Sequence, residues 1–281
     1  MPIIDGQIIA DEILKSLKKK IKSQKLKPRL AMILIGFHEP SYYYFRKVQQ
    51  EGHFIGITIQ KHILFYHTLE EQALEQIKQL NKDQNINGIL IQYPLPPHIK
   101  EGALLAAIDP EKDVDGFHPI NIQRLLKGRS SHVPPAFAAI LEILKSTGIC
   151  LEKKNAVLLV RSKTFGKPLS LLLQKEKIKT TIFIIELPSD LLQKKIIKAT
   201  KQADILISAL GSPKLITEQH VKPDSIIVDL GFVKKDQKII GDVDFEPVSK
   251  IARWITPVPR GVGPVTAAML LKNVVKVTQR K

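Results

Sequence analysis

Residues 157–173, which read VLLVRSKTFGKPLSLLL, decide the fold. Their first four residues are continuously apolar, as expected for a strand that is buried on both faces of a parallel sheet. Gly166 and Pro168 then open a second apolar segment, so the stretch predicts a strand that turns into a helix. Backbone N–H groups at such a helix start carry partial positive charge and bind phosphate groups. The stretch therefore indicates an α/β fold and a candidate site for the pyrophosphate of a dinucleotide.

Short apolar runs with strand character recur on both sides of this stretch. They lie at residues 30–36, 57–65, 88–94, 156–160, 181–185, 204–209 and 225–231. The segments between them have helical spacing, and they include residues 8–21, a stretch from 41, 68–80, a stretch ending near 200 and a last one from about 264. Thr68 and Glu71 form a capping-box pattern, which predicts Thr68 as the cap of its helix. This alternation predicts parallel sheets with crossover helices.

The helix-rich stretch 120–148 separates two sets of strands, so the sequence predicts two α/β domains. We expect the first domain to comprise residues 1–135 together with the C-terminal segment 262–281, and the second to comprise 136–261. Ligands of open α/β sheets bind beyond the carboxyl ends of the strands, and clefts between domains are common binding places. Functional residues are therefore expected where strands end.

Composition restricts the class of protein further. The chain has 281 residues, of which 44% are hydrophobic and 25% charged, as in ordinary globular proteins. Its single cysteine, Cys150, excludes an intramolecular disulfide and a zinc site built on cysteine pairs. The N-terminus lacks the pattern of a signal peptide, and no apolar run has the length of a membrane span. We therefore expect a soluble, cytoplasmic protein.

The charge balance is strongly basic, with 43 Lys and Arg against 27 Asp and Glu and a formal net charge of +16. Such a field attracts polyanions, including nucleic acid, anionic membranes and acidic small molecules. The lysines are scattered through many segments, however, and no basic motif of a known nucleic-acid module is present. Solvated helix faces are the favoured interpretation, with neither nucleic acid nor membrane as a partner.

Charged residues near the strand–helix turn give conflicting signals about a dinucleotide. Arg161 suits the 2′-phosphate of NADP, whereas Glu186, at the end of the strand 181–185, suits the ribose hydroxyls of NAD. Gly211 follows another strand of the same domain and permits close backbone approach. Because only Gly166 remains of a glycine fingerprint, a plain strand–helix turn with solvated charges fits the same residues.

The first domain carries polar candidates at its strand ends. Gln92 follows the strand 88–92 and suits the edge of a planar heterocycle, although a solvated loop glutamine fits equally. Asp113 and Asp115 suggest a metal by their spacing, but the further ligands of a calcium loop are missing, and one carboxylate binding a guanidine-like edge is as economical. Tyr44 lies on a predicted helix, and His118 is more typical of a helix cap than of a base.

Eight motifs occur together in an order and spacing that resemble one family. They read IIDGQIIA, IGFHEPSYYYFRK, GILIQYPLP, PEKDVDGFHPIN, RSKTFGKP, ADILISALGSP, GDVDF and PVPRGVGPVTAAMLL. Over essentially its whole length the chain resembles the bifunctional methylene-tetrahydrofolate dehydrogenase/methenyl-tetrahydrofolate cyclohydrolase family. The resemblance implies a catalytic N-terminal domain, a Rossmann-like dinucleotide-binding domain and a C-terminal helix that returns to the first domain.

The resemblance also implies roles for particular residues. Tyr44 would stack on the pterin–aminobenzoate part of a folate, Gln92 would lie near the reacting centre, and Asp115 would hold the amino edge of the pterin. These three are the expected catalytic residues, and the metal hypothesis is dropped. Three residues of the last helix would close the folate site, namely Gly263, Pro264 and Thr266.

For the cofactor, the resemblance implies NADP, with NAD as the alternative, and a homodimer as the assembled form. Residues of the phosphate turn, the following helix and two further loops would bind it, namely Val160, Arg161, Ser162, Gly166, Gly211 and Phe232.

The chain departs from the family pattern at several loop positions. Val48 stands four residues after Tyr44, where the family has a lysine that moves protons in ring opening, and Lys47 lies beside it. The other departures are the run 134–137, Val160, Glu186 and Arg260. We expect a working dehydrogenase with weak or lost cyclohydrolase activity. The alternatives are the full bifunctional enzyme, with Lys47 or water substituting, and a non-catalytic binding protein that keeps the fold.

Overall fold

The computed structural model describes residues 3–129, 132–186, 194–235 and 238–280. The chain forms two compact units, each made of two chain segments. Unit 1 comprises Met1–Ile9 and Ala136–Thr266, and unit 2 comprises Ala10–Pro135 and Ala267–Lys281. Both units contain a parallel sheet with covering helices, so the predicted α/β class is confirmed. The predicted domain bounds stay a prediction.

Unit 2 is built on a three-stranded parallel sheet in the order β2-β1-β3. Its strands are β1 (Arg29–Ile35), β2 (Thr58–Leu64) and β3 (Gly88–Gln92). The helices that belong to it wholly or in part are α1 (Gly6–Ser23), α2 (Glu39–Ile55), α3 (Glu70–Lys82), α4 (Glu101–Ala107), α5 (Pro119–Leu126) and α10 (Val262–Thr278).

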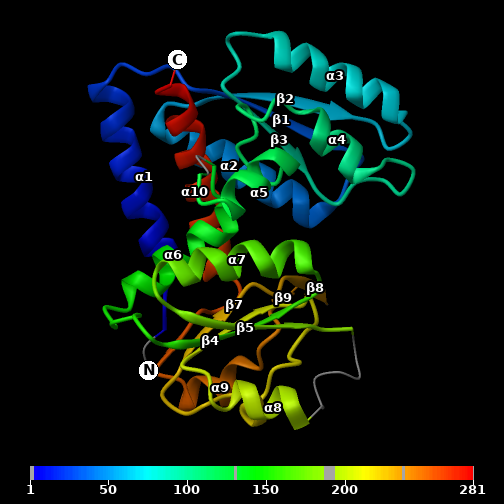
Figure 1. Cartoon of the computed structure of the whole chain (residues 1–281). Coiled ribbons are helices and arrows are strands. Elements are labelled where there is room, and N and C mark those ends of the chain that lie inside the picture. Colours follow the sequence, from blue (N-terminus) through cyan, green and yellow to red (C-terminus); the bar gives the residue numbers. More distant parts are fainter. Residues whose placement is uncertain (1–2, 130–131, 187–193, 236–237, 281) are drawn as a thin grey trace. The chain divides into compact units, whose positions relative to one another are not determined.

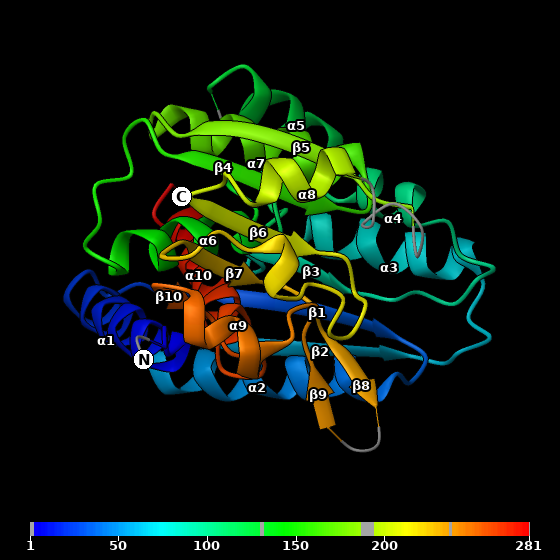
Figure 2. The same cartoon turned by 90° about the horizontal axis from the view of Figure 1, so that it is seen from below.

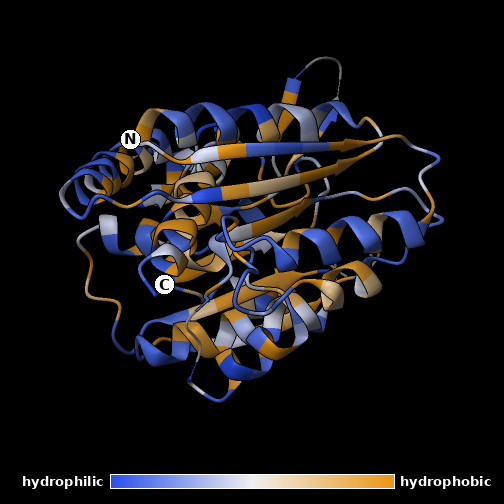
Figure 3. Ribbon diagram, turned by 90° about the horizontal axis from the view of Figure 1, so that it is seen from above, coloured by the Kyte–Doolittle hydropathy of each residue, from blue (hydrophilic) through white to orange (hydrophobic). Residues whose placement is uncertain are grey.

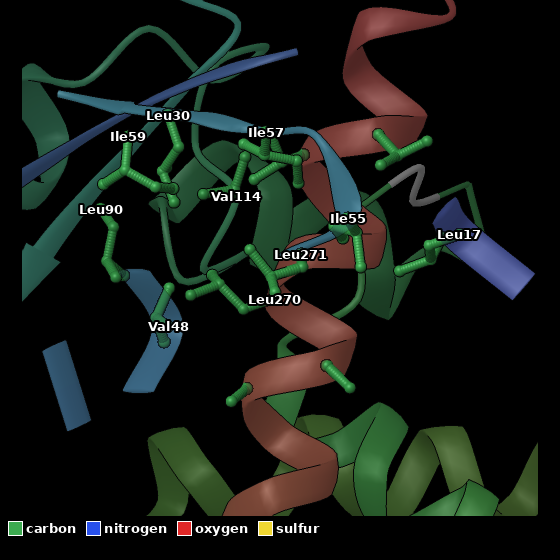
Figure 4. Close-up of a cluster of buried hydrophobic side chains, with 14 of the residues drawn as sticks. Leu17, Leu30, Val48, Ile55, Ile57, Ile59, Leu90, Val114, Leu270 and Leu271 are labelled. Carbon is green, nitrogen blue, oxygen red and sulfur yellow. The ribbon is translucent and has the colours of Figure 1, made fainter. Parts of the chain in front are cut away.

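Alternate residues of these strands serve two separate cores, as the two-residue period of a strand dictates. Ala31, Ile33 and Ile89 point to one face and pack in a cluster with residues of α3 and α4. Leu30 and Leu90 point to the other face and pack with α1, α2 and α10. Figure 4 shows part of this second cluster, with leucines of α10 lying against the strand residues. Strands β1 and β3 are therefore buried on both faces, whereas the edge strand β2 is largely exposed.

Unit 1 contains a five-stranded parallel sheet in the order β10-β7-β6-β4-β5. Its strands are β4 (Asn155–Val160), β5 (Lys179–Ile184), β6 (Ile205–Ala209), β7 (Ile226–Asp229) and β10 (Trp254–Ile255). Helices α6 (Pro135–Ser146) and α7 (Lys163–Lys175) lie on one side of the sheet in Figure 1, and α8 (Lys194–Thr200) and α9 (Phe245–Ile251) lie on the other. A short antiparallel pair, β8 (Val233–Lys235) and β9 (Lys238–Ile240), forms a separate hairpin (Figure 2).

The strand order of unit 1 creates a switch point beside β4. The chain passes from β4 to β5 on one side and then crosses to β6 on the other side of β4. Ligands of doubly wound sheets bind at such a point, beyond the carboxyl ends of the strands. In this unit the loops that begin at Arg161 and Leu210 occupy that position, since β4 ends at Val160 and β6 at Ala209.

Two helix starts differ from the sequence prediction. The cap of α3 is Leu69 and not Thr68, because the Gln72 side chain accepts the Leu69 N–H at 3.0 Å and closes the first turn one residue later. Helix α7 begins at Lys163, before Gly166, because the Ser162 hydroxyl caps it by accepting the Phe165 N–H at 3.3 Å. Gly166 therefore lies inside the helix and does not open it.

The distribution of apolar residues follows this layering. Figure 3 shows strands coloured largely hydrophobic and helices on which hydrophobic and hydrophilic stretches alternate. Across the ranges that the structure describes, no helix combines the length and the apolar character that a membrane crossing requires.

Candidate active site

Helix α2 and strand β3 of unit 2 are joined at their ends by hydrogen bonds to one carbonyl. The Tyr93 carbonyl accepts the Ser41 hydroxyl at 2.6 Å and the Gln92 side-chain amide at 3.1 Å. Since the Ser41 hydrogen is used there, the bond of 2.8 Å between Ser41 and His38 Nδ1 places the proton on His38. The first turn of α2, and with it Tyr44 one turn later, is thereby fixed to the loop that carries Gln92.

The loop after residue 112 is shaped by a buried carboxylate. Asp113 is fully buried and accepts three bonds of 2.9 Å, from the N–H groups of Gly116 and His118 and from the Asn121 amide. It is therefore a structural acceptor. Asp115, two residues further on, is only partly buried and supplies the carboxylate available for a ligand.

Tyr44 and Asp115 influence each other electrostatically. Burial and the nearby charge of Asp113 raise the pKa of Asp115 to about 7. Burial raises the pKa of Tyr44, and the carboxylates of Asp115 and Glu51 raise it further, so the phenol stays protonated. Unit 2 thus brings Tyr44, Gln92 and Asp115 to one edge, where an aromatic ring, an amide and a carboxyl with adjustable protonation are available.

The Asp115 loop is also held from the C-terminal helix. The Asn273 side-chain amide of α10 donates to the carbonyls of Val114 and Val133, both at 2.9 Å. Gly116 has φ +74°, and a Cβ there would lie 2.9 Å from the Pro134 nitrogen. Sequence reasoning missed Asn273, for which no local signal exists. It also passed over the bridging role of Ser41, although that residue lies in a quoted motif.

Position 48 is part of the hydrophobic core. Val48 is 0% exposed, and Figure 4 shows its side chain pointing toward Leu90 and Leu270. Lys47, one residue earlier, forms an i,i+4 ion pair of 3.2 Å with Glu51. Burial raises the pKa of Glu51, while Lys47 opposes that rise. Lys47 is therefore engaged by a neighbour on its own helix.

His118 is a helix cap, as predicted. Its Nδ1 accepts the Ile120 N–H at 3.1 Å, at the start of α5. The proton is consequently on Nε2, which lies 3.3 Å from the Ala106 carbonyl. Both ring nitrogens are thereby used in holding the loop.

In unit 1 the strand–helix turn exposes its charges and buries its valine. Arg161 is exposed, and Ser162 caps α7. Val160 is fully buried, and its Cγ2 would lie 2.9 Å from a Cβ at Gly166, so its side chain is directed at α7. The Val160 side chain therefore packs against the helix and not beyond the strand end.

Two more predicted residues lie on loops at the same sheet edge. Gly211 has φ +64°, and no atom lies within 4 Å of where its Cβ would be. Phe232 follows β7 and is 50% exposed. Glu186 is exposed just beyond β5. An open edge with a capped helix start and a left-handed glycine fits the phosphates of a dinucleotide.

The remaining predicted residues lie in the first turns of α10, within unit 1. Gly263 is exposed with no atom near its Cβ position, and Pro264 is buried. The Thr266 hydroxyl donates to the Val262 carbonyl at 3.0 Å. Arg260, just before the helix, forms an ion pair of 2.5 Å with Asp5, and the guanidinium lowers the pKa of Asp5. This departure from the family pattern thus has a structural partner.

Within the part of the chain that the structure describes, no group of three or more His, Cys, Asp or Glu side chains is arranged to hold a metal ion.

Two family models match consecutive parts of the chain. Residues 4–115 match the tetrahydrofolate dehydrogenase/cyclohydrolase catalytic domain, and residues 134–281 match the NAD(P)-binding domain of the same family.

Individual relatives match over almost the full length. The bifunctional protein FolD of Listeria innocua is 40% identical over an alignment of length 282, which covers 99% of this chain and 97% of the relative. The crystal structure of the bifunctional enzyme FolD of Campylobacter jejuni is 37% identical, with a TM-score of 0.92 over 100% of this chain and 99% of its own. The Trypanosoma brucei dehydrogenase-cyclohydrolase, solved with NADP and an inhibitor, is 31% identical with a TM-score of 0.92 over 100% and 99%.

Proposed function

The chain belongs to the tetrahydrofolate dehydrogenase/cyclohydrolase family, and from that premise we propose that it oxidises methylene-tetrahydrofolate to methenyl-tetrahydrofolate with NADP, while its cyclohydrolase step is weak or lost. The observation that carries the first part is the grouping of Tyr44, Gln92 and Asp115 in unit 2, fixed by Ser41 and Asp113. The three residues match the family motifs in order and spacing.

Each of the three side chains has a chemical task in this proposal. The Tyr44 hydroxyl stays protonated, and the Tyr44 ring stacks on the pterin–aminobenzoate part of the folate. Asp115, with a pKa of about 7, binds the amino edge of the pterin and gains a stronger hydrogen bond as it ionises. Gln92 orients the one-carbon bridge. The resemblance adds Gly263, Pro264 and Thr266 of α10 as proposed folate contacts.

The cofactor contacts that we propose come from unit 1. When bound there, NADP would supply the acceptor for a hydride. Arg161 and Ser162 bind its phosphates at the start of α7, and Val160 contributes backbone only. The other contacts are Gly166, Gly211 and Phe232. Arg161 and Glu186 are both exposed, so burial does not decide between NADP and NAD. We propose NADP because the Arg161 guanidinium suits a 2′-phosphate.

The second part of the proposal rests on α2. Hydrolysis and ring opening need a proton relay, and losing a general acid–base group costs on the order of a hundredfold in rate. Val48 is buried in the core and has no titratable group. Lys47 is paired with Glu51, which holds its ammonium along the helix. Hydride transfer depends mainly on positioning and so survives these changes.

Two assays test the two parts separately. The purified chain is supplied with methylene-tetrahydrofolate and either NADP or NAD, and cofactor reduction is followed by absorbance. Methenyl-tetrahydrofolate is then supplied alone, and its decay is compared with the spontaneous rate. We expect reduction of NADP faster than of NAD and decay near the spontaneous rate. Reduction of neither cofactor would favour a non-catalytic binding protein, and fast decay would favour the full bifunctional enzyme.

The setting of this activity completes the proposal. We place the protein in the cytoplasm as a homodimer, the assembly that the resemblance implies. Its small-molecule partners are tetrahydrofolate derivatives, whose acidic tails suit the net charge of +16. Neither nucleic acid nor a membrane is required.

A further inference from the structure

Two buried aspartates of unit 1 lie at the strand-end edge without belonging to any predicted site. Asp229 ends β7 and is 3% exposed, and Asp242 follows β9 and is 0% exposed. Each carboxylate accepts three hydrogen bonds from unit 1, which offset part of the cost of burying it.

Asp242 holds the loop after β6. Its Oδ2 accepts the Ser208 hydroxyl at 2.8 Å and the Leu210 N–H at 2.7 Å, and its Oδ1 accepts the Ser212 N–H at 2.8 Å. The N–H groups on both sides of Gly211 are therefore directed at one carboxylate. This arrangement fixes the left-handed conformation of Gly211, whose φ is +64°.

Asp229 holds the loop after β7 and Asp242 itself. Its Oδ1 accepts the N–H groups of Gly231 at 2.7 Å and Asp242 at 3.1 Å, and its Oδ2 accepts the Val243 N–H at 2.9 Å. Gly231 immediately precedes Phe232. Asp229 thus fixes the backbone of Asp242 by a hydrogen bond, and Asp242 in turn fixes the Gly211 loop.

The packing around the pair leaves no room for side chains. A Cβ on Gly231 would lie 2.3 Å from Asp242 Oδ1, and a Cβ on Gly241 would lie 2.1 Å from Asp229 Oδ2. Both distances are far below a van der Waals contact. The two glycines are therefore needed so that the backbone can approach the carboxylates.

From this geometry we infer that Asp242, held in place by Asp229, is a positioning residue for the dinucleotide. Asp242 fixes the Gly211 loop, and Asp229 fixes the loop that carries Phe232, both beside the switch point of the sheet. The inference rests on the proposed function, since that function makes these loops cofactor contacts. Asp242 acts through the backbone of the loops and does not itself touch the cofactor.

A cost in stability supports a functional role for the pair. Burial and the charge of Asp242 raise the pKa of Asp229 to about 7, against the opposing effect of its backbone hydrogen bonds. A neutral residue would avoid this penalty, but it accepts fewer N–H groups. The two carboxylates therefore hold the loops in place at a cost to the stability of the folded chain.

The test compares Asp242→Asn with Asp204→Asn. Asp204 stands just before the same strand β6 at its other end, where it accepts the Asn155 N–H at 2.9 Å and pairs with Lys222 at 2.7 Å. In Asp242→Asn, an NH2 group replaces one of the two acceptor oxygens and faces a hydrogen-bond donor. The loop after β6 must then shift. We expect a rise in KM for NADP of tenfold or more, with KM for methylene-tetrahydrofolate and kcat within about threefold. Asp204→Asn should leave both KM values unchanged.

Further measurements keep the inference falsifiable if Asp242→Asn does not fold. Ser208→Ala removes one of the three donors, and it should raise the Kd for NADP two- to fivefold without a change for folate. A Kd for NADP equal to that of the wild type in this variant, or an unchanged KM in folded Asp242→Asn, would overturn the inference alone. Failure of the wild type to bind NADP would overturn the proposed function as well.

Discussion

Asp115, for which we propose a ligand-binding role, carries a cost in the folded chain because its carboxyl is buried and lies near the charge of Asp113. Its pKa is about 7 in the folded chain and near 3.8 in an unfolded one, so the folded chain binds the proton more tightly. Its stabilising contribution is therefore complete below pH 4 and is lost as the pH rises through 7.

Asp115→Asn should accordingly stabilise the protein above pH 7 while it removes activity. We expect its free energy of unfolding to exceed that of the wild type by roughly 1 kcal/mol or more at pH 8, and the gain to shrink by pH 5. Urea denaturation at both pH values measures this. Asp204→Asn is the matched control and should destabilise at pH 8, because hydrogen bonds from Asn155 and Lys222 outweigh partial burial and lower the pKa of Asp204. A variant less stable than the wild type at pH 8 would contradict the argument.

Val48→Lys tests the proton relay directly. The change restores an ammonium one turn after Tyr44, and we expect hydrolysis of methenyl-tetrahydrofolate to rise on the order of a hundredfold. Because position 48 is buried, Val48→Met serves as a control of similar length without a charge. Circular dichroism of both variants checks folding. If folded Val48→Lys hydrolyses no faster than Val48→Met, the missing lysine is not what limits the step.

At this scale the sequence indicates candidate site residues but not what holds them. Gln92 follows a predicted strand and Tyr44 lies on a predicted helix, whereas Asp115 stands out through its motif alone. Asn273 lies far along the chain from the loop that it holds, so no local pattern reveals it. The direction of the Val160 side chain likewise depends on its packing against α7, which its neighbours in sequence do not reveal.

Among the elements, the strands are the most predictable from sequence. Each of the seven predicted apolar runs overlaps a strand of the two parallel sheets. The signal is strongest for β1 and β4, because a strand buried on both faces is apolar almost throughout. Helix starts are less predictable, because a cap is chosen by competing side chains. Gln72 closes the first turn of α3 at Leu69, and Ser162 starts α7 ahead of Gly166.

The contact between β4 and α7 yields a test on the stability of unit 1. A Cβ at Gly166 would lie 2.9 Å from the side chains of Val160 and Ile182. Gly166→Ala should therefore lower the free energy of unfolding by about 1–3 kcal/mol through overpacking. Val160→Ala removes one of the two contacts and should recover part of the loss in the double variant. Thermal melts of the single and double variants measure the coupling, and strictly additive effects would exclude the contact as its cause.

For the whole molecule, the net charge of +16 is the property that the fold does not explain. Like charges repel in the compact state, and salt shortens the range of that repulsion from about 30 Å at 0.01 M to about 10 Å at 0.1 M. We expect the Tm to rise by several degrees between 10 and 200 mM sodium chloride. The double variant Lys19→Glu/Lys22→Glu, on the exposed face of α1, should show a smaller rise. A Tm that falls with salt would show that ion pairs dominate.

Neither unit is a continuous stretch of chain. In unit 1 the Ile4 N–H bonds to the Ile255 carbonyl at 2.9 Å, and the main core of unit 2 takes seven of its buried residues from 267–277. During translation, therefore, the main core of unit 2 stays incomplete until residues 267–277 have been made, although the cluster around α3 and α4 lies within residues 31–108. The apolar side chains of α1, α2 and the sheet must avoid aggregation until α10 packs against them.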